Sequence, residues 1–109
     1  MNEKDAVLTL GALAQDARLR IFRTLIGSAN QGLTPGELSA TLGIPASTLS
    51  FHLKELAQAG LVRVARESRH LIYRPSVHHM NDLIAYLTDH CCEGQDCGIQ
   101  QQTVPLVCK

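Results

Sequence analysis

Apolar residues recur along the chain at two spacings, and each spacing predicts a different element. A repeat of three to four residues places apolar side chains on one face of a helix. It predicts five helices, over residues 4–14, 16–26, 34–42, about 46–59 and 76–90. Between the last two helices, Val62 and Val64 alternate with polar residues, and Leu71–Tyr73 follow the polar stretch Arg66–His70. That arrangement predicts a two-stranded hairpin.

The last predicted helix carries an apolar seam that is long for a chain of 109 residues. Its members recur every three or four positions: Val77, Met80, Ile84 and Leu87, with Leu83 beside them. Such a seam is typical of a surface that packs against a partner helix. In the first helix, Val7, Leu10 and Ala14 form a second stripe.

Turn residues set the ends of the two central helices. Thr34 and Glu37 have the spacing of a capping box, and Pro35 suits the first helical position. Gly43-Ile44-Pro45 ends that helix in a sharp turn, and Gly60 ends the next one. Helix, tight turn, helix and hairpin make up a winged helix-turn-helix. We therefore expect a mainly α fold with a small β-hairpin (α+β), whose second central helix enters the major groove of DNA.

Composition limits the class of protein. A chain of 109 residues with 45% hydrophobic residues fits one globular domain. No apolar run approaches the roughly 18 residues that a membrane span requires, so we expect no membrane partner. The start MNEKDAVLTL does not resemble a signal peptide. We therefore expect a reducing cytoplasm, where the four cysteines are ligands or reactive thiols rather than disulfides.

The formal net charge of zero conceals a local basic region. Residues 46–75 carry five basic and two acidic side chains, a net charge of +3, whereas residues 76–109 carry one basic and four acidic side chains. A homodimer would double this basic footprint. The charge distribution therefore allows DNA binding.

Candidate DNA contacts fall in this basic region. They are Ser47, Thr48, Ser50 and His52 on the second central helix, and Arg66, Arg69 and His70 in the hairpin. Short hydroxyls near a helix start reach phosphates and base edges. Cations in the hairpin, which is the wing of this architecture, reach the minor groove or the backbone of DNA. Taken singly, such hydroxyls are commonly caps, such arginines commonly face solvent, and His52 can instead tie its helix to a neighbour. Their combination on one architecture favours DNA binding.

Three segments carry a family resemblance: LGALAQDARLRIFRTLI, LTPGELSATLGIPASTLSFHLKELAQAGLV and the hairpin through LIYRP. They resemble the ArsR/SmtB family of metal-sensing repressors over roughly residues 6–90. The resemblance implies a non-enzymatic homodimer that pairs through its first and last helices and binds double-stranded operator DNA. It also implies release of that DNA when a metal or metalloid binds.

Chain length predicts one domain over residues 1–109. Residues 34–75 would form the DNA-reading helices and wing, residues 76–97 the dimer helix and cysteine cluster, and residues 98–109 a mobile tail.

The cysteines suggest the inducer. One recurrent family site uses Cys-x-Cys on the first central helix, and residues 37–42 contain no cysteine. Instead Cys91, Cys92 and Cys97 follow the last helix, in a CC-x-G-x-x-C pattern similar to that of arsenic-responsive subgroups. Three thiolates suit soft trivalent arsenite or antimonite. Adjacent helical cysteines point about 100° apart, so the helix must end or turn for the three to converge. Cys108 is interpreted as a spare thiol.

Zinc is the first alternative. His79, His90 and Glu93 have the spacing of the family's dimer-helix zinc site, but Val77 stands where that site begins with Asp. Zinc prefers four ligands, so the missing carboxylate weakens this alternative.

Redox chemistry supplies further alternatives. A repressor that senses oxidation through Cys91, Cys92 or Cys97 stays open, as does a cytoplasmic metalloid-binding or thiol-redox protein without DNA binding. A thiol enzyme is disfavoured, because the acidic helix end should oppose thiolate formation.

Overall fold

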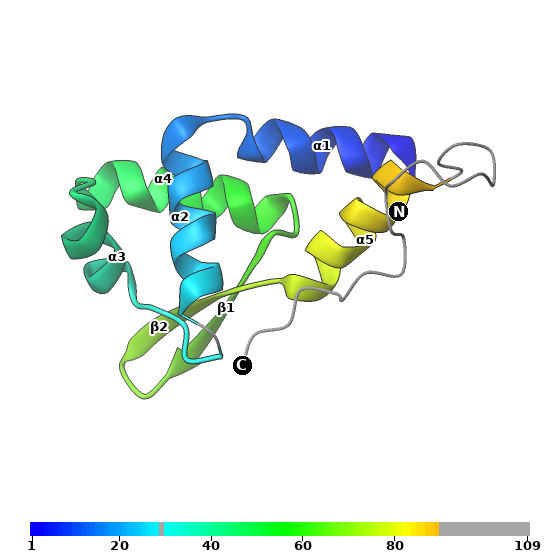
Figure 1. Cartoon of the computed structure of the whole chain (residues 1–109). Helices are drawn as coiled ribbons and strands as arrows, with labels where there is room; N and C mark the ends of the chain where they lie inside the picture. The colour runs from blue at the N-terminus through cyan, green and yellow to red at the C-terminus, as the bar shows by residue number, and fades with distance from the viewer. Residues whose placement is uncertain (29, 90–109) are drawn as a thin grey trace.

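A computed structural model describes residues 1–28 and 30–89, which form five helices and one two-stranded sheet. In chain order the elements are α1 (Glu3–Leu13), α2 (Asp16–Gly27), α3 (Pro35–Leu42), α4 (Ala46–Gln58), β1 (Val62–Glu67), β2 (His70–Pro75) and α5 (Val77–Thr88). Figure 1 shows α1 and α5 at one end of the molecule, with α3 and the hairpin tip at the other. The predicted mainly α fold with a small hairpin is confirmed. Within the described ranges, no helix has the length and hydropathy needed to span a membrane.

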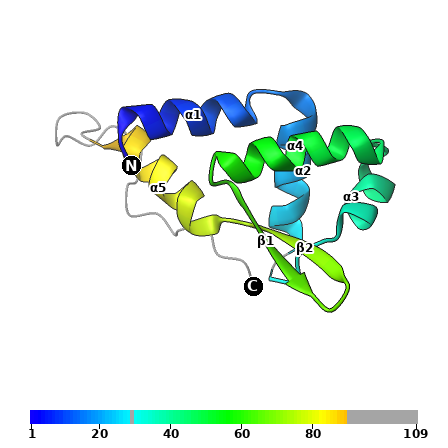
Figure 2. The same ribbon diagram turned by 180° about the vertical axis from the view of Figure 1, so that it is seen from behind.

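Helix α4 lies at the centre of the hydrophobic core. Its inward positions Leu49, Leu53 and Leu56 are completely or almost completely buried. They belong to one cluster with Ile21 and Leu25 of α2. Burying each such side chain stabilises the fold by roughly 1.5–3 kcal/mol. Seen from behind, α4 reaches from the end with α3 to the end with α1 and α5 (Figure 2).

The α3–α4 turn is fixed by local hydrogen bonds. The Glu37 amide donates to Thr34 Oγ1 at 3.1 Å, and the Thr34 amide donates to Glu37 Oε1 at 2.9 Å, which completes the predicted capping box. Gly43 closes α3 with a left-handed φ of 69°. The Ser39 hydroxyl then donates to the carbonyl oxygen of Ile44 at 2.6 Å. These contacts set the direction in which α4 leaves the turn.

The hairpin is longer and its turn tighter than predicted. The strands pair antiparallel from Val62 with Pro75 to Glu67 with His70, so part of the predicted polar loop is strand. Only Ser68 and Arg69 form the turn, and Ser68 has a φ of 59°. On its other edge, β2 gains a bridge from Tyr73 to Leu33, with backbone hydrogen bonds of 3.0 and 2.8 Å.

The apolar stripes of the two outer helices are only partly buried within one chain. In α1 the buried residues are Ala6, Thr9 and Ala12, whereas Val7 and Leu10 of the predicted stripe are exposed. Within the α5 seam, Met80 and Leu83 are buried, but Ile84 and Leu87 are exposed. The stripes therefore mark residues that one chain leaves uncovered as well as residues in its core.

Candidate DNA-binding surface

The first turns of α4 present a row of hydroxyl groups to solvent. Ser47, Thr48 and Ser50 are all exposed, because Leu49 and Leu53 take the inward positions of the helix. Pro45 precedes the helix without a side-chain cap, so the amides of the first turn have no capping side chain. Such amides attract phosphate oxygens. This end of α4 can therefore contact both backbone and bases of DNA.

His52 lies on the inner side of α4, where it bonds to α2. It is 5% exposed, and its Nδ1 accepts a hydrogen bond from Arg18 Nε at 3.1 Å. Burial lowers the pKa of the imidazole, and the Arg18 charge lowers that pKa further. The ring is therefore neutral near pH 7, with its proton on Nε2. Of the two roles considered for His52, the structure supports the tie between helices.

One ring nitrogen of His52 has no hydrogen-bond partner among the described residues. The described residues contain no buried side-chain nitrogen or oxygen without a partner, and Nε2 has no hydrogen bond there. Nε2 is therefore the ring nitrogen left for a ligand. A phosphate next to this edge of α4 could accept a hydrogen bond from Nε2.

The sequence interpretation missed Phe51, which lies between Ser50 and His52. Its side chain is 55% exposed, and the Arg18 guanidinium carbon lies 5.5 Å from the ring centre. The signal that could have identified it is rotation: Phe51 is four residues after Ser47 and three before Lys54, opposite the inward leucines. Phe51 therefore belongs to the outward face of α4.

The hairpin supplies the basic part of the surface. The predicted wing residues Arg66, Arg69 and His70 are all exposed, and Arg69 lies in the turn itself. No ion pair involves these three residues in the described part of the chain. Their side chains can therefore reach DNA without breaking a contact within the protein.

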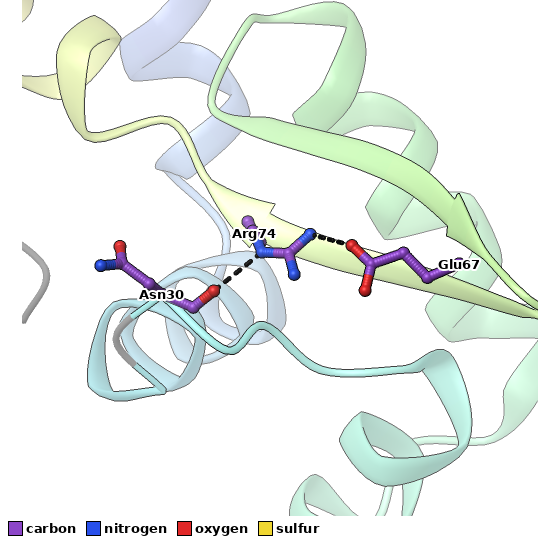
Figure 3. Close-up of polar contacts among 3 residues, drawn as sticks. All are labelled: Asn30, Glu67 and Arg74. Carbon is purple, nitrogen blue, oxygen red and sulfur yellow. Dashed lines mark hydrogen bonds and ion pairs between the residues drawn. The ribbon is translucent and has the colours of Figure 1, made fainter.

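Arg74 has a different role from the other hairpin arginines. Its Nε donates to the carbonyl oxygen of Asn30 at 2.8 Å, and its Nη1 donates to Glu67 Oε2 at 2.9 Å (Figure 3). The loop after α2 lies tightly against β2 here, since a Cβ on Gly32 would come within 2.7 Å of Ile72 Cγ2. Arg74 thus connects β1 near the hairpin turn with the loop after α2.

The alternative zinc site is only partly described. His79 Nε2 lies 2.9 Å from Thr9 Oγ1, which also bonds to the Asp5 carbonyl oxygen at 2.8 Å. His90 and Glu93 lie outside the described residues. Within residues 1–28 and 30–89, no group of three His, Cys, Asp or Glu side chains could hold a metal. His79 therefore has a structural partner on α1 that zinc binding through Nε2 would displace.

The predicted thiolate site also falls outside the described residues. Cys91, Cys92, Cys97 and Cys108 all lie beyond Asp89, so the site stays a prediction. The described helix α5 ends at Thr88, and Asp89 already has extended backbone angles.

Comparison with known proteins places the chain among transcriptional regulators. A helix-turn-helix domain model matches residues 13–65. The transcriptional activator HlyU of Vibrio cholerae is 34% identical over 93 residues, which are 85% of this chain and 83% of that protein. The structure of HlyU from Vibrio cholerae N16961 has a TM-score of 0.65 at 33% identity, over 84% of this chain and 99% of that one. A structure of reduced HlyU from Vibrio cholerae N16961 matches at 33% identity and a TM-score of 0.61, over 86% of this chain and 94% of that one.

Two further solved structures share the fold. An ArsR-like transcriptional regulator from Rhodococcus sp. RHA1 has a TM-score of 0.74 over 83% of this chain and 82% of that one. Its identity of 21% supports the fold alone. A "possible transcriptional regulator for arsenical resistance" has a TM-score of 0.63 at 28% identity, over 72% of this chain and 79% of that one.

Proposed function

The chain belongs to the ArsR/SmtB family of winged-helix transcriptional regulators, and from that premise we propose a homodimeric repressor that trivalent arsenic or antimony releases from its operator. Family membership makes it a DNA-binding transcriptional regulator and not an enzyme. The observation that carries the DNA-binding proposal is the surface formed by the exposed hydroxyls of α4 and the unpaired wing cations.

On DNA, α4 enters the major groove with its N-terminal end toward the bases. Ser47, Thr48 and Ser50 contact phosphates and base edges there, and His52 donates from Nε2 to a phosphate. Arg66, Arg69 and His70 of the wing contact the adjacent minor groove or backbone. This division of contacts is the usual geometry of the winged helix-turn-helix.

The homodimer forms through α1 and α5. Four exposed aliphatic side chains support this proposal: Val7 (63%), Leu8 (59%), Ile84 (42%) and Leu87 (55%). Covering them removes apolar surface from water at about 25 cal/mol per Å². Two copies joined in this way present two α4 helices to the two halves of a symmetric operator.

The proposed sensor is the trio Cys91, Cys92 and Cys97. Arsenous acid exchanges its three hydroxyls for three sulfurs, and three waters leave, so the metalloid itself removes the thiol protons. The end of α5 at Thr88 supports the site, because the described helix does not continue toward the adjacent cysteines. The likeness to a possible regulator for arsenical resistance supports the inducer class. A coupling free energy of about 1–3 kcal/mol would lower operator affinity about 5- to 150-fold.

A redox-sensing repressor is the second candidate, and the likeness to reduced HlyU favours it. Peroxide would oxidise two of the three thiols to a disulfide and be reduced to water. Zinc ranks third, because His79 already bonds to Thr9.

The test is operator binding by the reduced full-length protein, measured by fluorescence anisotropy with arsenite, antimonite, peroxide or zinc as titrant. We expect arsenite and antimonite to release the DNA, and Cys91→Ser, Cys92→Ser or Cys97→Ser to abolish that release. Cys108→Ser is the matched control and should respond like the parent protein.

Each other outcome would overturn a specific part of the proposal. Arsenite release that survives Cys97→Ser would contradict the three-thiolate site. Release by peroxide alone would establish the redox alternative, and release by zinc that is lost in His90→Ala would establish the zinc site. A transcription assay on the same operator decides between repression and the activation that the name of HlyU records.

A further inference from the structure

The two phenylalanines of the chain have opposite surroundings. Phe22 of α2 is 5% exposed within the core, whereas Phe51 of α4 is 55% exposed. A phenyl ring gains roughly 1.5–3 kcal/mol from full burial, so its exposure in the middle of a well-packed helix is a cost to one chain alone.

Neighbouring side chains hold the Phe51 ring in place before any ligand binds. The Arg18 guanidinium carbon lies 5.5 Å from the ring centre, and the His52 ring centre lies 5.8 Å away with the planes tilted by 55°. Arg18 is itself fixed by its hydrogen bond to His52 Nδ1 at 3.1 Å. A ring held in this way loses little conformational freedom on binding, which favours affinity.

The position of Phe51 identifies the ligand as DNA. The ring lies on the outward face of α4, one turn from Ser47 and one turn from Lys54. Arg18 lies over the ring, and the next helical turn brings Lys54 and Glu55 to the same side, so two cations face one carboxylate. The excess of positive charge favours a polyanion over a second apolar protein surface. The base edges in the major groove carry one prominent apolar group, the C5-methyl of thymine, and phenylalanine is among the side chains that contact it.

We propose that Phe51 reads a thymine C5-methyl in each operator half-site, and that Arg18 is the positioning residue that orients its ring. This inference rests on the proposed DNA binding and adds a base preference to it. Hydroxyls and cations alone would not distinguish thymine from uracil, because the two bases differ only in that methyl group.

The test replaces thymine with deoxyuridine, one position at a time, in an operator selected from random duplexes by the parent protein. We expect each half-site to contain one thymine whose replacement, by itself, weakens binding about fourfold. The loss of one buried methyl group implies an effect of this size. Phe51→Ala should bind thymine and uracil duplexes equally. Arg18→Gln should lower the thymine-to-uracil affinity ratio toward one. Leu19→Ala, an exposed aliphatic residue of α2, is the control and should keep the parent ratio.

The outcomes separate this inference from the proposed function. Specific operator binding by the parent protein with no uracil-sensitive position would overturn the role of Phe51 and leave the proposed function standing. An unchanged ratio in Phe51→Ala would also overturn it, and a dimer that dissociates in that variant would assign the ring to a second copy instead. If the parent protein selects no duplex, the proposed function itself fails.

Discussion

The two ends of this molecule expose different chemistry. The end formed by α3, α4 and the hairpin presents hydroxyls and cations, with Arg18 and Arg74 bonded to their neighbours beneath them. The end formed by α1 and α5 exposes long aliphatic side chains, of which Val7 is 63% and Leu87 is 55% exposed. Both ends belong to one core, because α4 contacts helices at each of them.

This difference shows which tasks one chain completes. The DNA-facing end is ordered by contacts within the chain, so a single copy already has the surface that reads a half-site. The α1/α5 end leaves apolar surface in water, and in the proposed homodimer a second copy covers it. Reading DNA and pairing are therefore separable, and substitutions at the two ends should have different effects.

The largest effect should come from disrupting the proposed homodimer. Leu8→Glu places a charge in the proposed interface, and burying an unpaired charge there opposes dimer formation. We expect a monomer by sedimentation velocity. Operator affinity should fall about 100-fold or more, since the second half-site no longer adds avidity.

Leu71→Glu at the hairpin is the matched control for that prediction. Leu71 is 41% exposed, so the substitution should leave the dimer intact and weaken DNA binding through charge repulsion alone. A Leu8→Glu protein that stays a dimer would contradict the assignment of α1 to the interface.

The next effect concerns the wing. Arg66→Ala or Arg69→Ala should each weaken operator binding and reduce the slope of log affinity against log salt by about one per lost phosphate contact. The measurement is anisotropy over a range of salt concentrations. Lys4→Ala on α1 should leave the slope unchanged. An unchanged slope in both wing variants would place the wing off the DNA.

A smaller effect concerns the pH dependence of stability. The folded pKa of His52 lies below its ordinary value of 6.5, because the ring is buried and next to Arg18. The unfolded chain therefore binds a proton first as the pH falls, so the free energy of unfolding should decrease below about pH 6.5 and level off above it. Denaturant titrations should show a weaker dependence in His52→Gln and the parent dependence in His70→Gln, whose imidazole is exposed. The same curve for His52→Gln and the parent protein would contradict this role.

The smallest effect concerns the two bonds made by Arg74. Arg74→Met removes the hydrogen bond to Asn30 and the ion pair with Glu67, in which the two side chains are 25% and 53% exposed. Exposed pairs contribute little, so the free energy of unfolding should fall by about 1 kcal/mol or less. Glu67→Gln keeps the Asn30 bond and should cost less still. A loss of several kcal/mol in Arg74→Met would mean that these two bonds belong to the cooperative core.

The elements that local chemistry determines were predictable from the sequence. Thr34 and Glu37 form the capping box because both partners lie within one turn, and Gly43 ends α3 because its φ is positive. The inward face of α1 was not predictable in this way. Val7 and Leu10 mark an apolar stripe, but a stripe does not say whether the same chain or a partner covers it, and small Ala6 and Ala12 pack in their place.

In the candidate site, too, features set by nearby residues were predictable and features set by residues far apart in sequence were not. The exposure of Ser47 and Ser50 follows from helical periodicity alone. Phe51 was missed because aromatic residues are usually assigned to cores, although helical rotation places it on the outward face of α4. Its contact with Arg18, far away in sequence, was not predictable in this way. The bond between Arg74 and Asn30 likewise joins residues 44 positions apart. The thiolate site at Cys91, Cys92 and Cys97 stays a prediction.

The most direct test of the account is a hydroxyl-radical footprint of the reduced full-length protein on its operator, combined with the stoichiometry of the complex. Two chains per duplex should protect two segments whose centres lie about 10–10.5 base pairs, or a multiple of that spacing, apart. Leu8→Glu should lose this paired pattern. One protected segment per complex, or the same paired pattern in Leu8→Glu, would contradict the claim that one end reads DNA while the other holds two copies together.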